Sequence, residues 1–182
     1  GVITRKGRVE DGNTISDYDK EEINRKFSIS ASVIPVEWNG LKINILDAPG
    51  YFDFVGQLED AMSVADAAGF EAGVEVGTIK AWEICERRRI PRIFFVTNMD
   101  SPNAKYMETV EQLKEHFGKK VAPFHLPILE NDKLTGYVNV VKMGGRKFLD
   151  DAGNYTERDI PDSVKPKLEP VREQLMEAVA ES

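Results

Sequence analysis

The order of apolar and polar positions predicts strands that alternate with helices over residues 20–118. Two strand-like runs, residues 28–38 and 41–47, flank the dipeptide Asn39–Gly40. Asn-Gly between two such runs is the strongest short-range signal for a hairpin turn, so we expect these strands to pair antiparallel. A later apolar run, residues 91–100, is β-rich and ends in polar residues, which is typical of a buried parallel strand.

Helical signals fill the segments between these strands. Asp19 and Glu22 have the spacing of a capping box, so we expect a short helix over residues 20–25. Further helices are predicted over three segments, residues 56–68, 74–89 and 103–118. The last of these carries one apolar face, formed by Ala104, Met107, Val110, Leu113 and Phe117. Gly118 is its predicted stop, and the alternation of helices with strands indicates an α/β sheet.

From Val121 onward the pattern changes to strand-like runs around an Asn131–Asp132 turn. A polar link with a proline, residues 151–163, then leads to a final helix. Four residues form the apolar stripe of that helix: Leu168, Val171, Leu175 and Val179. We therefore divide the chain into an α/β part, residues 1–120, and a β-rich insertion with a terminal helix, residues 121–182.

Size, charge and cysteine content narrow the class of protein. The chain has 182 residues, a net charge of -7 and a pI near 5.0, which argues against strong independent binding to nucleic acid. The single cysteine, Cys85, rules out an internal disulfide, and we expect it to pack as a small core residue on a helix. No signal peptide or apolar run long enough to span a bilayer is present, so we expect a soluble, cytoplasmic protein.

Two loops that follow predicted strands carry the candidate chemistry. In the first, Asp47 can hold the hydration shell of Mg²⁺, Pro49 fixes the turn, and Gly50 lets its backbone N–H approach a phosphate. In the second, the carboxylate of Asp100 can accept hydrogen bonds from the N–H groups of a guanine edge. On residues alone, the first loop is also ordinary turn chemistry, and Asp100 is also a candidate helix N-cap.

Several stretches in order resemble a known family. They are "RVEDGNTISDYDKEE", "RKFSI", "INILDAPGYFDFVGQLEDAMSVADAA", "GVEVGTIKAWE" and "PRIFFVTNMDSPNA". Together they resemble the G domain of bacterial elongation factor G, and most closely its elongation-factor-G-like branch. The resemblance implies a P-loop NTPase-like G domain over residues 1–120 and the G-prime-type subdomain that this family inserts over residues 121–182. It further implies a translational GTPase that binds GTP or GDP and Mg²⁺, acts on the ribosome, and docks the ribosomal stalk protein through the inserted subdomain.

The resemblance assigns roles to individual residues. Five residues match the second switch of the family: Asp47, Ala48, Pro49, Gly50 and Tyr51. Four residues match the guanine-reading loop: Thr97, Asn98, Met99 and Asp100. Ser28 matches a magnesium-ligating threonine, so Ser28 and Asp47 are the implied metal residues. Tyr51 stands at the position of the family's catalytic histidine, and Thr97–Asn98 replaces the family's Asn-Lys pair.

Two further departures concern the central sheet. The phosphate-cradling loop Gly-x-x-x-x-Gly-Lys-Ser/Thr is absent, and Gly118-Lys119 is followed by another lysine. We therefore expect the chain to be cut at both ends inside one functional unit. Only residues 69–72 stand where the family has a buried strand, so we expect that strand to be lost and the central sheet to be incomplete.

Two other functional interpretations stay open at this point. A non-enzymatic module would bind a protein partner through residues 121–161 and have no independent affinity for nucleotide. A metal-dependent hydrolase unrelated to GTP is remote, because no cluster of His, Asp and Glu ligands is evident. His116 and His125 are both expected to be packing or surface residues, and neither forms a nucleophile motif with Cys85.

Overall fold

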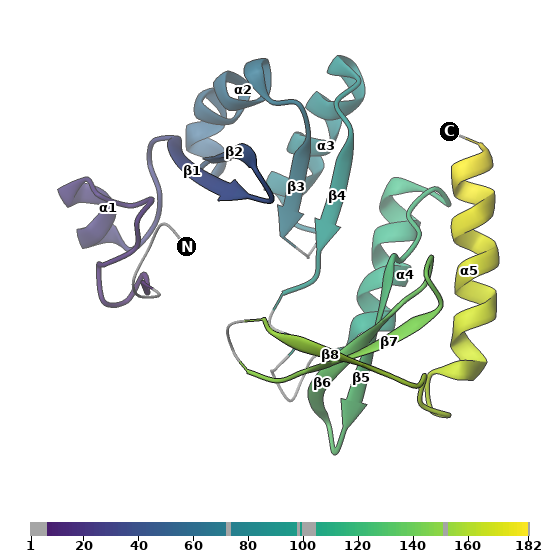
Figure 1. Ribbon diagram of the computed structural model, residues 1–182. Coiled ribbons are helices and arrows are strands. Elements are labelled where there is room, and N and C mark those ends of the chain that lie inside the picture. The colour runs from purple at the N-terminus through teal and green to yellow at the C-terminus, as the bar shows by residue number, and fades with distance from the viewer. Residues whose placement is uncertain (1–6, 72–73, 98, 100–104, 151–152, 182) are drawn as a thin grey trace. The chain divides into compact units, whose positions relative to one another are not determined.

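The computed structural model describes residues 7–71, 74–97, 99, 105–150 and 153–181, and these divide into two compact units (Figure 1). The first unit contains residues 1–70 and 75–94, and the second contains residues 71–74 and 95–182. The last boundary between the two units, after Phe94, therefore lies upstream of the boundary predicted at residue 120. The assignment of residues 121–182 to an inserted subdomain stays a prediction.

The first unit contains the predicted helices and strands together with a strand, β3 (Ala68–Glu71), and a 3-10 helix, η1 (Phe52–Phe54), that were not predicted. Its elements are α1 (Lys20–Arg25), β1 (Ser32–Trp38), β2 (Leu41–Asp47), the 3-10 helix η1 (Phe52–Phe54), α2 (Val55–Val64), β3 (Ala68–Glu71), α3 (Val76–Arg88) and β4 (Arg92–Phe95). In the part of the chain that the structure describes, β1 pairs with β2 and β3 pairs with β4, each as a two-stranded sheet. The capping box of α1 and its predicted bounds are confirmed.

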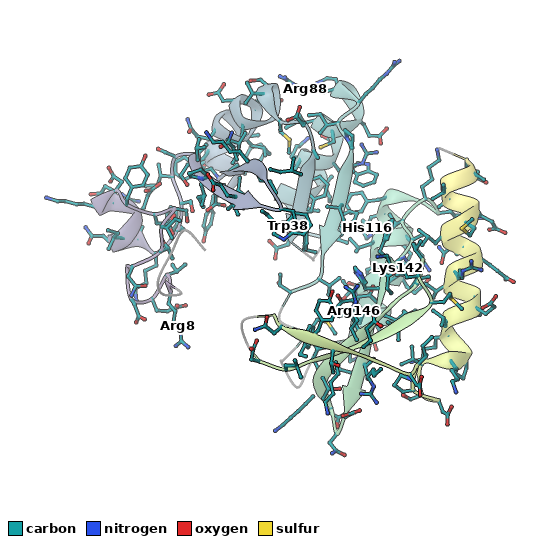
Figure 2. All side chains as sticks on the ribbon, viewed as in Figure 1. Arg8, Trp38, Arg88, His116, Lys142 and Arg146 are labelled. Atoms are coloured by element: carbon teal, nitrogen blue, oxygen red, sulfur yellow. The ribbon has the colours of Figure 1, made fainter. Side chains whose placement is uncertain are left out.

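β1 and β2 form the predicted antiparallel hairpin. The register runs from Ser32 opposite Asp47 to Trp38 opposite Leu41, beside the turn. Trp38 is labelled in Figure 2. Asn39 has φ 49° and Gly40 has φ 75°, the left-handed pair that a type I′ turn requires. One face of this hairpin is apolar: Ile34, Val36, Trp38, Leu41, Ile43 and Ile45. Most of these side chains are exposed.

β3 corrects the expectation that a strand is lost at residues 69–72. Ala68 and Phe70 are buried on one face of this short strand, and the Ala68 N–H donates to the Pro91 carbonyl at 2.9 Å. The expectation was wrong because a strand needs alternation rather than several large side chains, and two buried positions are enough here. Cys85 of α3 lies fully buried in the same cluster, as predicted.

The second unit consists of a helix, a four-stranded antiparallel sheet in the order β5-β6-β7-β8, and a long terminal helix. The elements are α4 (Tyr106–Phe117), β5 (His125–Glu130), β6 (Lys133–Asn139), β7 (Gly144–Phe148), β8 (Tyr155–Arg158) and α5 (Lys165–Ala180). The predicted turn between β5 and β6 is confirmed, with positive φ at both Asn131 and Asp132.

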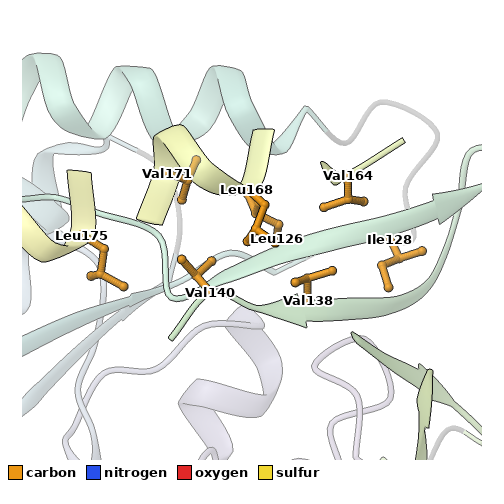
Figure 3. Packing of buried hydrophobic residues seen from close by; sticks show 8 residues of the cluster. All are labelled: Leu126, Ile128, Val138, Val140, Val164, Leu168, Val171 and Leu175. Carbon is orange, nitrogen blue, oxygen red and sulfur yellow. The ribbon is translucent and has the colours of Figure 1, made fainter. Parts of the chain in front are cut away.

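One apolar cluster joins the strands of the second unit to α5 (Figure 3). It contains Leu126, Ile128, Val138, Val140, Val164, Leu168, Val171 and Leu175. Val179, predicted to continue this stripe, is instead 61% exposed, while Ala178 is 8% exposed. The stripe continues three residues after Leu175 rather than four, because 3.6 residues per turn require steps of three and four to alternate.

α4 packs against the same cluster. Tyr106 and Met107 lie against it, and the Tyr106 hydroxyl donates to the His125 carbonyl at 2.7 Å. Burial raises the pKa of Tyr106 to about 12. The helix ends at Gly118 as predicted, and of its expected apolar face Val110 and Leu113 are buried, while Ala104 lies outside the described residues. No helix in the described part of the chain is long and apolar enough to cross a membrane.

Candidate functional site

The loop from Asp47 to Tyr51 begins where β2 ends. Asp47 and Ala48 are half-buried and Pro49 is buried, so the start of the loop is held in place by packing. Gly50 is exposed, and no described atom lies within 4 Å of the position that a Cβ on this residue would occupy. Its backbone is therefore open to a ligand on that side, as a phosphate-contacting glycine requires.

Gly50 also touches the start of α3. A Cβ placed on Gly77, in the first turn of that helix, would lie 2.9 Å from the Gly50 carbonyl oxygen. Real Cβ atoms are not found so close to a backbone oxygen. Only glycine at position 77 therefore lets α3 approach the loop without moving it.

An aromatic cluster connects this loop to the segment that carries Ser28. The rings of Phe27 and Tyr51 lie 4.7 Å apart, and Phe27 is 6.3 Å from Phe54 of η1. Tyr51 is itself exposed. A second link is a hydrogen bond of 2.8 Å from the Ala31 N–H to Oε1 of Gln57 in α2. The structure thus brings the two predicted switch segments side by side.

Ser28 contacts an acid that the sequence analysis did not single out. Its Oγ donates to Oδ1 of Asp17 at 2.6 Å, and the Thr14 hydroxyl donates to Oδ2 of the same carboxylate at 3.1 Å. Asp17 is buried, although it belongs to an acidic stretch whose composition is typical of a solvated face. The Ser28 hydroxyl proton is therefore used in the hydrogen bond to Asp17, while the lone pairs of its oxygen remain able to bind a cation.

Glu22 fixes the backbone next to Ser28. Its Oε1 accepts the N–H groups of Ile29 and Ser30 at 3.0 Å each, and its Oε2 accepts the Asp19 N–H at 3.1 Å. Burial of the carboxylate acts to raise its pKa, but the N–H donors, led by Ser30, outweigh burial and lower the pKa. Glu22 is therefore a buried, ionised carboxylate whose oxygens accept bonds from backbone donors.

The oxygen donors present fit Mg²⁺ in a nucleotide site. A carboxylate at Asp47, a hydroxyl at Ser28 and a second acid at Asp17 are hard oxygen ligands of the kind that this ion prefers. Among the described residues, no group of three or more His, Cys, Asp or Glu is placed to hold a metal alone.

The predicted guanine-reading loop follows β4 and belongs to the second unit. Thr97 is exposed and Met99 is half-buried. Asn98 and Asp100 lie outside the described residues, so their predicted role stays a prediction. The Ser28 and Asp47 segments, by contrast, lie in one unit and are joined by a ring contact and a hydrogen bond.

Comparison with known proteins identifies the class. Residues 1–181 match the family described as the elongation factor Tu GTP binding domain, and the chain belongs to this family. A crystal structure of a protein from Thermus thermophilus superimposes with a TM-score of 0.89 at 33% sequence identity. The match covers 99% of this chain and 27% of the other, so the chain spans about a quarter of that relative's length. The predicted G-domain fold and the resemblance to elongation-factor-G-like translational GTPases are confirmed.

Proposed function

We propose that the chain is the GTP-binding part of an elongation-factor-G-like GTPase that hydrolyses GTP on the ribosome in the cytoplasm, during translocation or a related step. Membership of the GTP-binding family supports this proposal. Two links carry it: the Phe27–Tyr51 ring contact joins the Ser28 segment to the Asp47 loop, and the Ala31–Gln57 hydrogen bond joins that segment to α2, which follows the loop. Two linked loops can respond together to one phosphate.

The residues of the proposed site divide the work of binding and reaction. Ser28 and Asp47 would hold Mg²⁺, the Gly50 N–H would contact the terminal phosphate, and residues 97–100 would read the guanine base. When bound, Mg²⁺ neutralises charge that develops on the phosphate oxygens. Tyr51 takes the position of the water-orienting residue. Because a phenol is longer than an imidazole and directed differently, we expect it to change the hydrolysis rate more than the binding of GTP.

A second candidate function is docking of a protein partner, the ribosomal stalk, through residues 121–161 of the second unit. The second unit has an apolar core of its own between its sheet and α5, which would hold a docking surface in place without nucleotide. In this case the second unit would bind the stalk protein whether or not GTP is present.

Calorimetric titration of the longer parent protein with GTP and Mg²⁺ tests the proposed function. We expect saturable binding that Asp47→Ala weakens by about tenfold or more in the presence of Mg²⁺, as loss of a group that holds the metal's hydration shell does. Asp60→Ala, an exposed acid of α2, is the matched control and should leave binding unchanged. If the wild-type parent does not bind GTP, the proposed function is wrong.

Titration of the 182-residue chain with labelled GTP tests the second candidate, in which this chain has no affinity of its own for nucleotide. We expect weak or no binding, because the lysine and backbone donors that offset triphosphate charge are not in its sequence. Tight, saturable binding by this chain would contradict a function limited to protein docking.

A further inference from the structure

Two neighbouring glutamates of α1 have opposite environments. The Glu21 side chain is 62% exposed and forms an ion pair with Arg25 one turn later. Glu22 is 2% exposed, and its carboxylate is fully occupied by backbone donors. Moving a carboxylate out of water costs free energy. We therefore expect the hydrogen bonds of Glu22 to stabilise either the fold or the candidate site.

The bonds of Glu22 hold the backbone immediately after Ser28. One oxygen receives two consecutive N–H groups, from Ile29 and Ser30, and this bifurcated arrangement fixes the direction of both peptide units. Bonds to an ionised acceptor are roughly twice as strong as neutral ones. On the other side, the Ser28 hydroxyl donates to Asp17. Ser28 is thus held through its side chain by one buried acid and through the following backbone by another.

We propose that Glu22 is a positioning residue for Ser28, and this inference rests on the proposed function. Glu22 does not itself touch the predicted ligand. It fixes the peptides of Ile29 and Ser30 against α1, so that the Ser28 oxygen is presented to the cation before nucleotide arrives. Without the carboxylate, three backbone N–H groups lose their acceptor, and the Ser28 segment becomes free to leave α1.

Amide hydrogen exchange in the 182-residue chain, without nucleotide, tests whether Glu22 holds the backbone of Ile29 and Ser30 in place. In Glu22→Ala, we expect exchange at Ile29 and Ser30 to rise by about tenfold or more, as loss of a charged acceptor predicts. Glu22→Gln keeps one acceptor oxygen and should give an intermediate rise, which also decides the point if the alanine variant fails to fold. Glu21→Ala is the matched control. Unchanged exchange in both Glu22 variants, or an equal rise in the control, would overturn the proposal.

Magnesium titration of GTP binding in the longer parent protein tests the link to Ser28. We expect Glu22→Gln to require a several-fold higher Mg²⁺ concentration for half-maximal GTP binding and to leave GDP binding in chelator unchanged. A merely structural residue would lower thermal stability and weaken both nucleotides equally, and that result would contradict the positioning role. Wild-type protein that binds no GTP would refute the proposed function, whereas wild-type binding with the same Mg²⁺ curve in Glu22→Gln would refute the role of Glu22 alone.

Discussion

The core of the second unit and the hairpin and switch segments of the first unit are held in place by different means. In the second unit, strands and α5 share a closed apolar cluster in which Ile128 and Val138 have no exposed surface. In the first unit, the hairpin that leads into the candidate site leaves much of its apolar face exposed. The segment that precedes β1 is held mainly by hydrogen bonds, such as the bond from Ile29 to Glu22 and the bond from Ala31 to Gln57.

This contrast fits the work that each unit is proposed to do. A segment held by a few hydrogen bonds and ring contacts can be released at a small free-energy cost, which a loop that responds to phosphate requires. A segment held by an apolar cluster moves only when the cluster opens. The Ser28 and Asp47 segments therefore belong to the more easily rearranged part of the first unit, and a separate, well-packed unit follows in the sequence.

The largest expected effect is a loss of stability on truncating a core isoleucine of the second unit. An isoleucine of the first unit is the comparison. Ile128→Ala should lower the free energy of unfolding by about 3 kcal/mol, because a fully buried methylene-rich side chain leaves a cavity. Ile43→Ala, at a position that is 42% exposed, should cost less than about 1 kcal/mol. Urea denaturation followed by circular dichroism measures both. Equal losses at the two positions would contradict the difference in packing.

A smaller effect is expected where α4 joins the sheet of the second unit. Tyr106→Phe removes the bond to the His125 carbonyl and should cost about 1 kcal/mol at neutral pH. Because the folded-state pKa of Tyr106 is raised to about 12, its stabilising contribution is present below the ordinary value of 10.0 and is lost as pH rises from there. The alkaline loss of stability should be absent in the phenylalanine variant, and its persistence would count against Tyr106 as the cause.

Acid should affect the two units in different pH ranges. Burial and the charge of Arg146 lower the pKa of His125, so this contribution is present above the ordinary value of 6.5 and declines as pH falls through it. The lowered pKa of Glu22 gives a contribution that is present above 4.5 and lost at lower pH. Hydrogen exchange at a series of pH values should show the second unit loosening first. His125→Gln should remove that first step, and loss of protection in both units at the same pH would contradict this order.

The smallest effect expected is a gain in stability. Lys26 ends α1 with φ 61°, a left-handed conformation that glycine adopts without strain. Lys26→Gly should raise the free energy of unfolding by about 0.5 kcal/mol, since relief of backbone strain exceeds the added chain entropy. Thermal denaturation measures the change. Lys20→Gly, at the first residue of the same helix, is the comparison and should destabilise instead.

Local patterns in the sequence predict local structure well here. The Asn39–Gly40 turn, the α1 capping box and the stop at Gly118 are each set by residues within a few positions of one another, and all three are confirmed. The strand at residues 68–71 was missed because its burial depends on packing against α3 rather than on its own composition. The exposure of Val179 follows from helical phase, which one residue of drift is enough to change.

The candidate site was predictable only in part, for the same reason. Asp47 and Gly50 stand in a recognisable loop, but the contact between Ser28 and Asp17 joins residues eleven positions apart, in a stretch whose composition suggests solvent exposure. Nothing in the spacing of Phe27 and Tyr51 indicates that their rings meet. Contacts of this kind depend on how the backbone folds back, and no periodic pattern encodes that path.

The approach of Gly77 to the Gly50 carbonyl has a consequence for how this loop can change over evolutionary time. A side chain at position 77 would clash with the backbone of the loop from Asp47 to Tyr51. Relatives that carry a larger residue at position 77 should therefore place that carbonyl elsewhere or begin the helix differently. Positions 50 and 77 are expected to constrain each other during divergence, although η1, α2 and β3 all lie between them in the chain.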